Sequence, residues 1–209
     1  STIWDMQEKQ KYSLNLPDLF SEAAIYDPVL TLTVPKDITI RTGLDVLSHS
    51  LESIWNKNAT PVTINYAVKS AKLIVNNLVN LSNDLDNVDL RGNMMMACMY
   101  AGLAFSNTQT AVAHAISYYV TAHKGVPHGL ACSFTLPKLI DNVLGRYNFV
   151  DDALMEIFGE LSSNKLRILL KRLNVSTEFE SYGIDKQELV LLKKSLQNNK
   201  RAMNSLVFI

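Results

Sequence analysis

The sequence predicts a mainly α-helical protein, in which a short β-hairpin and a connector precede a long helical domain. Apolar side chains recur at the 3.6-residue spacing of helices from about residue 38 onward. Proline and capping residues stand where helices would begin. Alternating, strand-like runs occur in the first fifteen residues. We therefore expect two parts: residues 1–34 with the hairpin and connector, and residues 35–209 with the helices.

Length, charge and apolar content limit the classes of protein to which this chain can belong. The 209 residues suffice for one substantial domain, and a hydrophobic content of 47% excludes wholesale disorder. The 20 Lys and Arg residues are balanced by 20 Asp and Glu residues, which argues against a nucleic-acid partner. The sequence contains no long apolar run and no signal-like segment, so we expect no membrane partner and a cytoplasmic protein.

The first 36 residues should form two strands and an ordered connector. Residues 2–5 and 11–14 are typical of β-strands around a polar turn. An isolated hairpin is marginally stable in water, so this one should need a sheet that the given chain does not contain. Residues 15–36 carry three prolines and should connect to the helices, with short extended pieces at 24–26 and 30–34.

Three long helices should follow the connector. Apolar residues at helical spacing indicate the first helix at about residues 38–56. Thr60 and Pro61 are typical of the N-cap and the first residue of the second helix. The third helix contains the segment MMMACMYAGLAF, which is apolar all round, so it should be a buried central helix.

Shorter helices are expected in the second half of the chain. Residues 109–124 should form a helix that ends at Gly125. Pro127 should be the first residue of the next helix, which runs toward Leu144. Three further amphipathic helices are expected at residues 151–160, 164–173 and 186–196.

The chain has two cysteines, Cys98 and Cys132. Both lie in apolar surroundings, and neither belongs to a CxxC motif. Buried, reduced thiols are therefore the expected state of both.

Histidine is scarce in this chain, and the positions of its four histidines suggest a metal site. His49 follows Asp45 by four residues, which places both side chains on one helix face. His114 lies near the middle of its expected helix and His128 in the first turn of the next, so both can be presented to one point. Three neutral imidazoles and one carboxylate suit Fe²⁺ or Zn²⁺ better than Mg²⁺ or Ca²⁺.

Each part of this constellation also has a simpler interpretation. An Asp–His pair at this spacing is commonly a surface interaction worth about 0.2–0.5 kcal/mol. A single histidine in an alanine-rich helix, such as His114, is usually a hydrogen-bonded core residue, and the PHG at His128 is compatible with a simple turn. Spacing alone therefore leaves the metal site and the structural alternative open.

The segments that carry these residues resemble the metal-binding signature of the iron-containing (group III) alcohol dehydrogenases. They are GLDVLSHSLE and AVAHAISYYVTAHKGVPHGLACSFTLP, and IYDPVLTLTVPKDITIRTG is similar to that family's lead-in to its first ligand helix. The resemblance covers residues 2–144 closely and the remainder loosely. Carried over residue by residue, it implies metal ligands at Asp45, His49, His114 and His128.

This resemblance also implies a domain plan and an activity. In that family an α/β nucleotide-binding domain precedes the helical metal-binding domain, so residues 1–34 would include the tail of a domain absent here. The implied reaction is hydride transfer between NAD or NADP and a small-molecule alcohol or aldehyde, with Fe²⁺ or Zn²⁺ polarising the substrate oxygen. The sequence has no glycine-rich phosphate-binding loop, so the cofactor should bind through the missing domain and this chain alone should be inactive. We also expect a homodimer.

Three further residues are candidates for supporting roles. Many family members have a histidine of a proton path where this chain has Tyr118, which is expected either to hydrogen-bond the substrate or to pack. Ser-Tyr at this point resembles the branch that reduces phosphonoacetaldehyde-like substrates. His123, at a helix end, should be exposed or lie near nicotinamide and substrate. Glu52 is either a partner of a metal ligand or an ordinary exposed glutamate.

Two alternatives to this function stay open. One is a metalloenzyme domain of the glycerol-dehydrogenase or dehydroquinate-synthase type, although the Asp-x-x-x-His pair favours the iron-type family. The other is a non-catalytic helical module that mediates oligomerisation, in which the histidines are structural. Binding of one metal ion per chain would separate the enzymatic alternatives from the structural one.

Overall fold

The computed structural model describes residues 2–5, 7–8, 10–13, 19 and 21–209. Strand β1 (Thr2–Asp5) pairs antiparallel with strand β2 (Gln10–Ser13). The carboxylate of Asp5 accepts hydrogen bonds from the backbone N–H groups two and three residues later, which supports the turn. The expected hairpin is confirmed, with its second strand beginning one residue earlier. Leu14, expected in that strand, lies outside the described residues.

The connector contains a 3₁₀ turn, η2 (Pro28–Thr31). Asp27 caps it, because its side chain accepts a hydrogen bond from the N–H of Val29. The extended piece expected at residues 30–34 is therefore wrong: an Asp-Pro pair favours a turn at this point. Residues 24–26 lie in a described part of the chain and form no strand.

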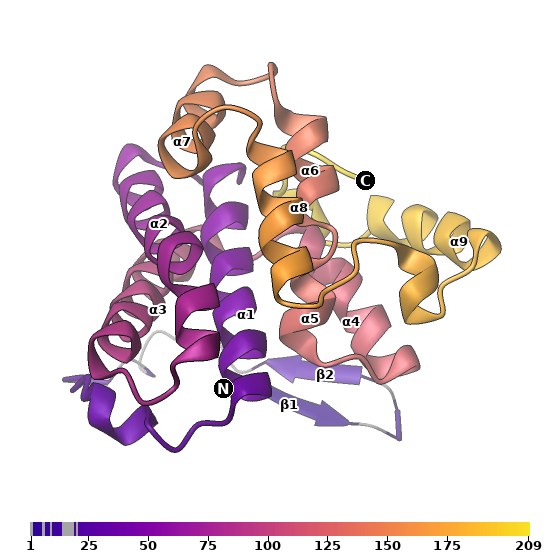
Figure 1. Cartoon of the computed structure of the whole chain (residues 1–209). Coiled ribbons are helices and arrows are strands. Elements are labelled where there is room, and N and C mark those ends of the chain that lie inside the picture. Colours follow the sequence, from indigo (N-terminus) through magenta and orange to yellow (C-terminus); the bar gives the residue numbers. More distant parts are fainter. Residues whose placement is uncertain (1, 6, 9, 14–18, 20) are drawn as a thin grey trace.

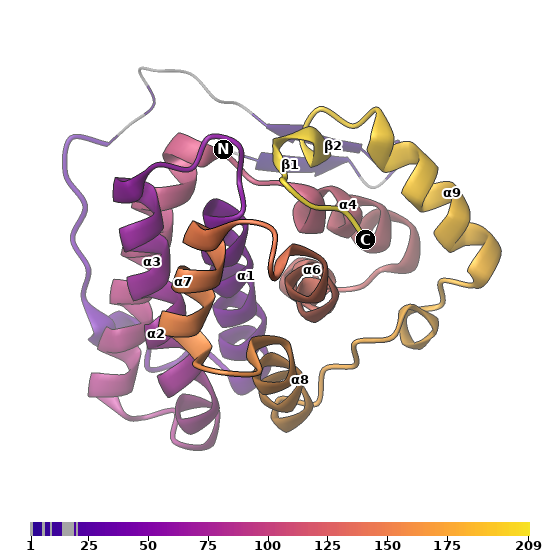
Figure 2. The same ribbon diagram turned by 90° about the horizontal axis from the view of Figure 1, so that it is seen from above.

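Helix α1 (Lys36–Ile54) is the centre of the fold. It lies between α2 (Pro61–Asn83) and α3 (Val88–Thr108) on one side and the helices of residues 112–143 on the other (Figures 1 and 2). A continuous apolar stripe on α1 is fully buried, formed by Leu44, Leu47, Leu51 and Ile54. The helix expected at residues 38–56 is confirmed, two residues earlier at each end.

The start of α2 is confirmed in detail. The hydroxyl of Thr60 accepts a hydrogen bond from the N–H of Thr63 at 3.2 Å, and the hydroxyl of Thr63 accepts one from the N–H of Thr60 at 2.8 Å. This reciprocal capping satisfies backbone donors that the first helical turn leaves unpaired. Pro61 is the first helical residue, where its missing N–H costs nothing.

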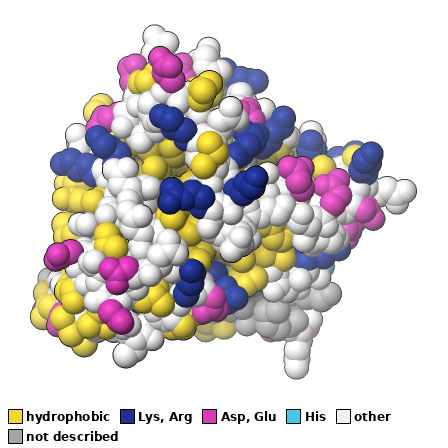
Figure 3. Space-filling view, viewed as in Figure 1, with side chains coloured by type: hydrophobic (Ala, Val, Ile, Leu, Met, Phe, Trp, Pro, Cys, Tyr) yellow, Lys and Arg dark blue, Asp and Glu magenta, His cyan; other side chains and the backbone are white. Residues whose placement is uncertain are grey.

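Helix α3 lies at the edge of the fold rather than at its centre. Few of its residues are buried: Arg91, Ala97, Ala101, Ala104 and Thr108. Met96 and Leu103 are 38% and 44% exposed. Figure 3 shows hydrophobic side chains at the surface on the side where Figure 1 draws this helix. The expected buried central helix is therefore wrong, because an all-apolar pattern does not specify which of its faces neighbours cover.

Three helices follow α3 and approach α1 from the other side: α4 (Val112–Lys124), α5 (His128–Ser133) and α6 (Leu136–Val143). Gly125 ends α4 in the left-handed conformation, at a φ of 69°, as a C-capping glycine. Pro127 is the N-cap of α5 rather than its first helical residue. The single helix expected to run toward Leu144 is two helices, because Pro137 has no N–H with which to continue the first.

The remaining helices agree with the expected ranges within three residues: α7 (Asn148–Phe158), α8 (Ser162–Arg172) and α9 (Lys186–Gln197). The C-terminal segment returns to the end of α1, where the N–H of Leu206 donates to the carbonyl of Trp55 at 3.0 Å. Among the described residues, no helix combines the length and apolar character that a membrane span requires. Cys132 is buried but Cys98 is exposed, so the burial expected of both cysteines is wrong for Cys98.

Candidate metal centre

The first two predicted ligands lie on one face of α1, as their spacing predicts. Nδ1 of His49 lies 2.9 Å from the backbone carbonyl oxygen of Asp45 and 3.7 Å from its carboxylate Oδ1. Because a carbonyl oxygen only accepts, Nδ1 carries the proton and Nε2 keeps a lone pair. Burial, helped by the charge of His114, lowers the pKa of His49 to about 4. The ring is therefore neutral at pH 7, which is the form that binds metals.

Helices α4 and α5 bring two more imidazoles to the same carboxylate. Nε2 of His114 lies 3.5 Å from Oδ1 of Asp45, and Nε2 of His128 lies 3.9 Å from it. The rings of His114 and His128 meet edge to face, with centroids 5.6 Å apart. The structure thus brings together three predicted ligands that are far apart in the sequence.

The approach of α5 to α1 depends on Gly129. A Cβ atom at this position would lie 1.9 Å from the backbone carbonyl oxygen of Arg41. Only glycine allows two helices to come this close. Since His128 is the residue before Gly129, the glycine fixes the distance at which that imidazole meets Asp45.

Two buried donor atoms at this point have no hydrogen-bond partner within the described part of the chain. They are Oδ1 of Asp45 and Nε2 of His114. An unpaired buried polar atom costs on the order of 1–3 kcal/mol, and such atoms are rare in folded proteins. A divalent cation bound by both atoms would remove this cost. Carboxylate oxygen with imidazole nitrogen is a donor set that suits Fe²⁺ or Zn²⁺, so the residues present fit such an ion.

A buried glutamate orients His114. Oε2 of Glu52 accepts a hydrogen bond from Nδ1 of His114 at 2.6 Å and another from the N–H of Ala111 at 2.8 Å. The N–H of Ala113 donates to the other carboxylate oxygen. Glu52 is fully buried, so the exposed alternative considered for it is wrong. With the proton held on Nδ1, Nε2 offers its lone pair toward Asp45.

The charges around the site favour a cation. Burial alone would raise the pKa of Asp45, but the nearby His114 and the charges of the two other neighbouring imidazoles hold it well below its ordinary value. For His114, burial lowers the pKa, but Cys132, Glu52 and Asp45 together raise it well above its ordinary value. The carboxylate therefore stays ionised, and its surroundings stabilise positive charge beside it.

A residue without a predicted role in metal binding lies in the same cluster. One donor atom from each of Asp45, His114, His128 and Cys132 lies within 4.8 Å of the other three. His49 is outside this set, although its ring lies 4.3 Å from that of His114, centroid to centroid. The sequence signal that could have found Cys132 is its position four residues after His128, on the same helix face.

The two predicted catalytic residues lie in different surroundings. The ring of Tyr118 stacks on that of His128, with centroids 6.1 Å apart. The guanidinium of Arg201 lies over the Tyr118 ring, 5.2 Å from its centre. His123 is exposed, which is the first of the two alternatives expected for it. Its ring stacks on Tyr119 at 4.4 Å, and it is outside the cluster of donor atoms.

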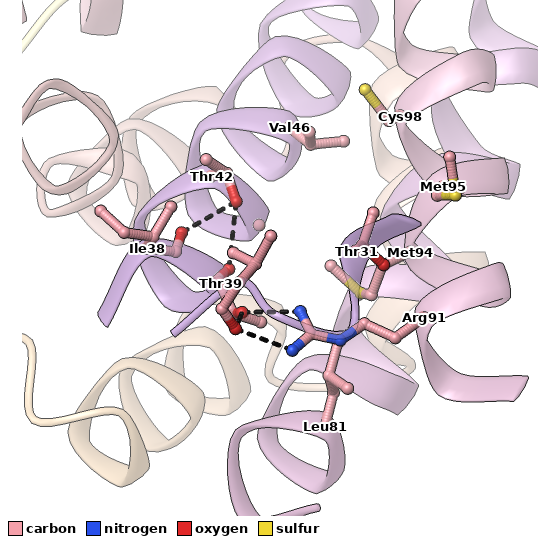
Figure 4. Close-up of a pocket in the computed structure, with 12 residues that line it drawn as sticks. Thr31, Ile38, Thr39, Thr42, Val46, Leu81, Arg91, Met94, Met95 and Cys98 are labelled. Atoms are coloured by element: carbon pink, nitrogen blue, oxygen red, sulfur yellow. Dashed lines mark hydrogen bonds between the residues drawn. The ribbon is translucent and has the colours of Figure 1, made fainter. Parts of the chain in front are cut away.

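One apolar cavity lies on another side of α1. Its volume is about 280 Å³, and it opens between the start of α1, η2 and α3 (Figure 4). The guanidinium of Arg91 closes one end, where it donates to the hydroxyl of Thr39 at 2.8 Å. None of the predicted metal ligands lines this cavity, so it is separate from the candidate metal centre.

Comparison with known proteins identifies related sequences over most of the chain. Residues 39–205 match the family model described as Fe-containing alcohol dehydrogenase family, C-terminal. A sulfoacetaldehyde reductase of Bilophila wadsworthia is 30% identical, over 97% of this chain and 58% of its own length. A 1-propanol dehydrogenase of Salmonella typhimurium is 38% identical, over 66% of this chain and 37% of its own.

A solved structure has the same fold. It is the sulfoacetaldehyde reductase of Bifidobacterium kashiwanohense in complex with NAD⁺, with a TM-score of 0.86 and 28% identity. The match covers 99% of this chain and 56% of that protein. The chain therefore spans little more than half the length of these two sulfoacetaldehyde reductases.

Proposed function

We propose a function for this chain from the family to which it belongs, the Fe-containing alcohol dehydrogenase family. The chain supplies the metal-binding part of an enzyme that transfers hydride between NAD or NADP and a small alcohol or aldehyde. Residues 35–209 would form the metal-binding domain, and residues 1–34 the tail of a nucleotide-binding domain with its connector. The proposed ligands of an Fe²⁺ or Zn²⁺ ion are Asp45, His49, His114 and His128.

One observation carries this proposal. Oδ1 of Asp45 and Nε2 of His114 are buried 3.5 Å apart without hydrogen-bond partners among the described residues, and Nε2 of His128 lies 3.9 Å from the same oxygen. A purely structural cluster would be expected to pair these atoms with each other or with neighbours. Their unpaired state supports a bound cation over the alternative of a non-catalytic oligomerisation module.

The side chains of the site would act by holding and orienting. A bound divalent ion supplies a Lewis acid for the substrate oxygen. Asp45 contributes negative charge, since its pKa is held low. Glu52 keeps the Nδ1 proton of His114 in place, and the Asp45 carbonyl does the same for His49, so both rings present Nε2. His114 is buried, so its Nε2 is shielded from solvent.

A substrate with an anionic group is the finer part of the proposal. The sequence resembles the branch that acts on phosphonoacetaldehyde-like substrates, and the relatives include a sulfoacetaldehyde reductase. Both substrates are aldehydes joined to an acidic group. Arg201 supports this substrate class, because its guanidinium lies over the Tyr118 ring, and that ring also stacks on His128. Among the described residues Arg201 forms no ion pair with a carboxylate, so its charge is available for a ligand.

The proposal also extends to assembly and location. We expect a homodimer in the cytoplasm, with a small-molecule substrate and with neither nucleic acid nor membrane as a partner. The balance of 20 basic and 20 acidic residues supports the exclusion of nucleic acid. Light scattering coupled to size-exclusion chromatography tests the dimer directly.

Metal analysis tests the function. The purified chain, stripped with a chelator and titrated with Zn²⁺ or Fe²⁺ under anaerobic conditions, should bind one ion per chain and melt at a higher temperature when loaded. His114→Ala should abolish both effects. His123→Ala is the matched control, since that imidazole is exposed and outside the cluster, and it should bind as the wild type does. A chain that binds neither ion would overturn the proposal.

A further inference from the structure

The thiol of Cys132 faces the same point as the predicted ligands. Its Sγ atom lies 3.8 Å from Nδ1 and 3.6 Å from Nε2 of His128, one turn earlier on α5. The residue is fully buried, with an exposed fraction of 0%. Its sulfur is also within 4.8 Å of a donor atom of Asp45 and of His114. The second cysteine, Cys98, is exposed and is not part of this cluster.

These spacings are those of donor atoms around a single ion. Zinc binds sulfur at about 2.3 Å and imidazole nitrogen at about 2.0–2.1 Å, so two ligand atoms of one tetrahedral site lie roughly 3–4 Å apart. The distances from Asp45 Oδ1 to the imidazoles, 3.5 and 3.9 Å, are of this size, as is the shorter distance from Sγ to His128. Within the described residues, two of the four donors are also buried without a hydrogen-bond partner.

We propose that Cys132 binds the metal as a thiolate, together with Asp45, His114 and His128, and that its sulfur selects Zn²⁺ over Fe²⁺ at this centre. The inference rests on the proposed metal-binding function and adds a ligand to it. On binding, the S–H bond of Cys132 breaks, the proton leaves to solvent, and a sulfur–metal bond forms without any change in oxidation state. Thiolate is a soft ligand, and a set of sulfur and imidazole donors suits zinc.

The position of His49 is compatible with this set. Its Nδ1 is occupied by the Asp45 carbonyl, and its ring packs against those of His114 and Phe105 at centroid distances of 4.3 Å. With Cys132 added, the proposed ligand set would have five members, and His49 would be the one outside the four-donor cluster.

Cobalt spectroscopy tests the sulfur ligand without an activity assay. The metal-free chain is loaded with one equivalent of Co²⁺, which replaces Zn²⁺ and gives a near-ultraviolet charge-transfer band only when a thiolate is bound. The wild type should show this band, and Cys132→Ser should bind Co²⁺ without it. Cys98→Ser is the matched control and should keep the band. Circular dichroism checks the fold, and Cys132→Ala replaces Cys132→Ser if the serine variant does not fold.

The outcomes separate this inference from the function on which it rests. Co²⁺ bound by the wild type without a thiolate band, or a band that persists in Cys132→Ser, overturns the sulfur ligand and leaves the metal site in place. A wild type that binds no Co²⁺ overturns both. In competition between Zn²⁺ and Fe²⁺, Cys132→Ser should reduce the preference for zinc by more than about tenfold. Tenfold is about the smallest loss of metal affinity that is typical when a residue only supports a ligand.

Discussion

Glu52 accepts a hydrogen bond from Nδ1 of His114 at 2.6 Å. Neither side chain is more than 2% exposed to solvent. The pair joins α1 to α4 across 62 positions of sequence. It gives a buried imidazole a single tautomer and aims Nε2 at Asp45. The candidate metal centre is thus supported by a carboxylate that does not belong to the donor cluster itself.

Replacement of Glu52 by glutamine should weaken metal binding without removing a ligand. The amide cannot hold the Nδ1 proton of His114 as a carboxylate does, so affinity for Zn²⁺ or Co²⁺ should fall by about 10–100-fold. Isothermal titration against a competing chelator measures the change. Glu156→Gln, which alters an exposed ion pair with Lys72, is the control and should bind as the wild type does. Unchanged affinity in Glu52→Gln would contradict the orienting role.

Gly129→Ala should destabilise the fold and the metal centre together. The new methyl group would meet the carbonyl oxygen of Arg41 at 1.9 Å, and the resulting separation of α5 from α1 should cost about 1–3 kcal/mol or more. Urea unfolding and metal titration measure the two effects. Gly102→Ala is the matched control: a Cβ there has no atom within 4 Å. As a helix-interior substitution it should raise stability by about 0.5–1 kcal/mol. Equal effects of the two substitutions would refute the packing argument.

Arg91→Met should lower the free energy of unfolding, although Arg91 is not one of the residues of the donor cluster. The guanidinium donates to the hydroxyl of Thr39 and to the carbonyl of Val34, both at 2.8 Å, and so ties α3 to the start of α1. Its removal leaves buried acceptors unpaired, at a cost of about 1–3 kcal/mol. Arg167→Met breaks an exposed ion pair with Asp141 and should cost at most about 1 kcal/mol. A smaller loss in Arg91→Met than in this control would count against the interpretation.

The attachment of α9 to α4 should depend on pH. The hydrogen bond from Lys124 to Glu188, 2.7 Å long, lowers the pKa of Glu188 below its ordinary value. A carboxyl with a lowered pKa in the folded state stabilises the fold above its ordinary pKa of 4.5, and this contribution is lost as the pH falls through the folded value.

Glu188→Gln isolates this effect, because glutamine can keep the capping box with Asp185 while the charge is lost. The difference in urea midpoint between wild type and variant should be present at neutral pH and vanish in acid. A difference that stays constant with pH would exclude an ionic contribution.

Arg201→Met should change substrate preference if the substrate carries an acidic group. The assay uses the whole protein that contains this chain. Its KM for a sulfonated aldehyde should rise by about 10–100-fold, because a charge-assisted hydrogen bond is worth about 1.5–3 kcal/mol. The rate with propanal should change little. NADH and NADPH oxidation, followed by absorbance, measures both. Equal losses for the two aldehydes would indicate a structural role for Arg201, which also bonds Thr110.

The sequence by itself determined the helical class and part of the geometry of the candidate metal centre. Spacing was enough to place Asp45 and His49 on one face of α1, since residues four apart share a helix face whatever surrounds the helix. The cap at Thr60 and the break at Gly125 were likewise local, because capping and a left-handed backbone depend on neighbouring residues alone. The resemblance to a family supplied the ligand set, including the pairing of His114 with His128.

Only the tertiary structure decided which groups meet between helices. Glu52 and His114 are 62 residues apart, so no periodicity could show whether the carboxylate is exposed or buried against the imidazole. Cys132 was expected only to be a buried, reduced thiol, because burial follows from apolar surroundings. Its proximity to Asp45 depends on the packing of α5 on α1. For the same reason α3 was wrongly expected at the centre: composition gives the apolar area of a helix, and its neighbours decide how much of that area is covered.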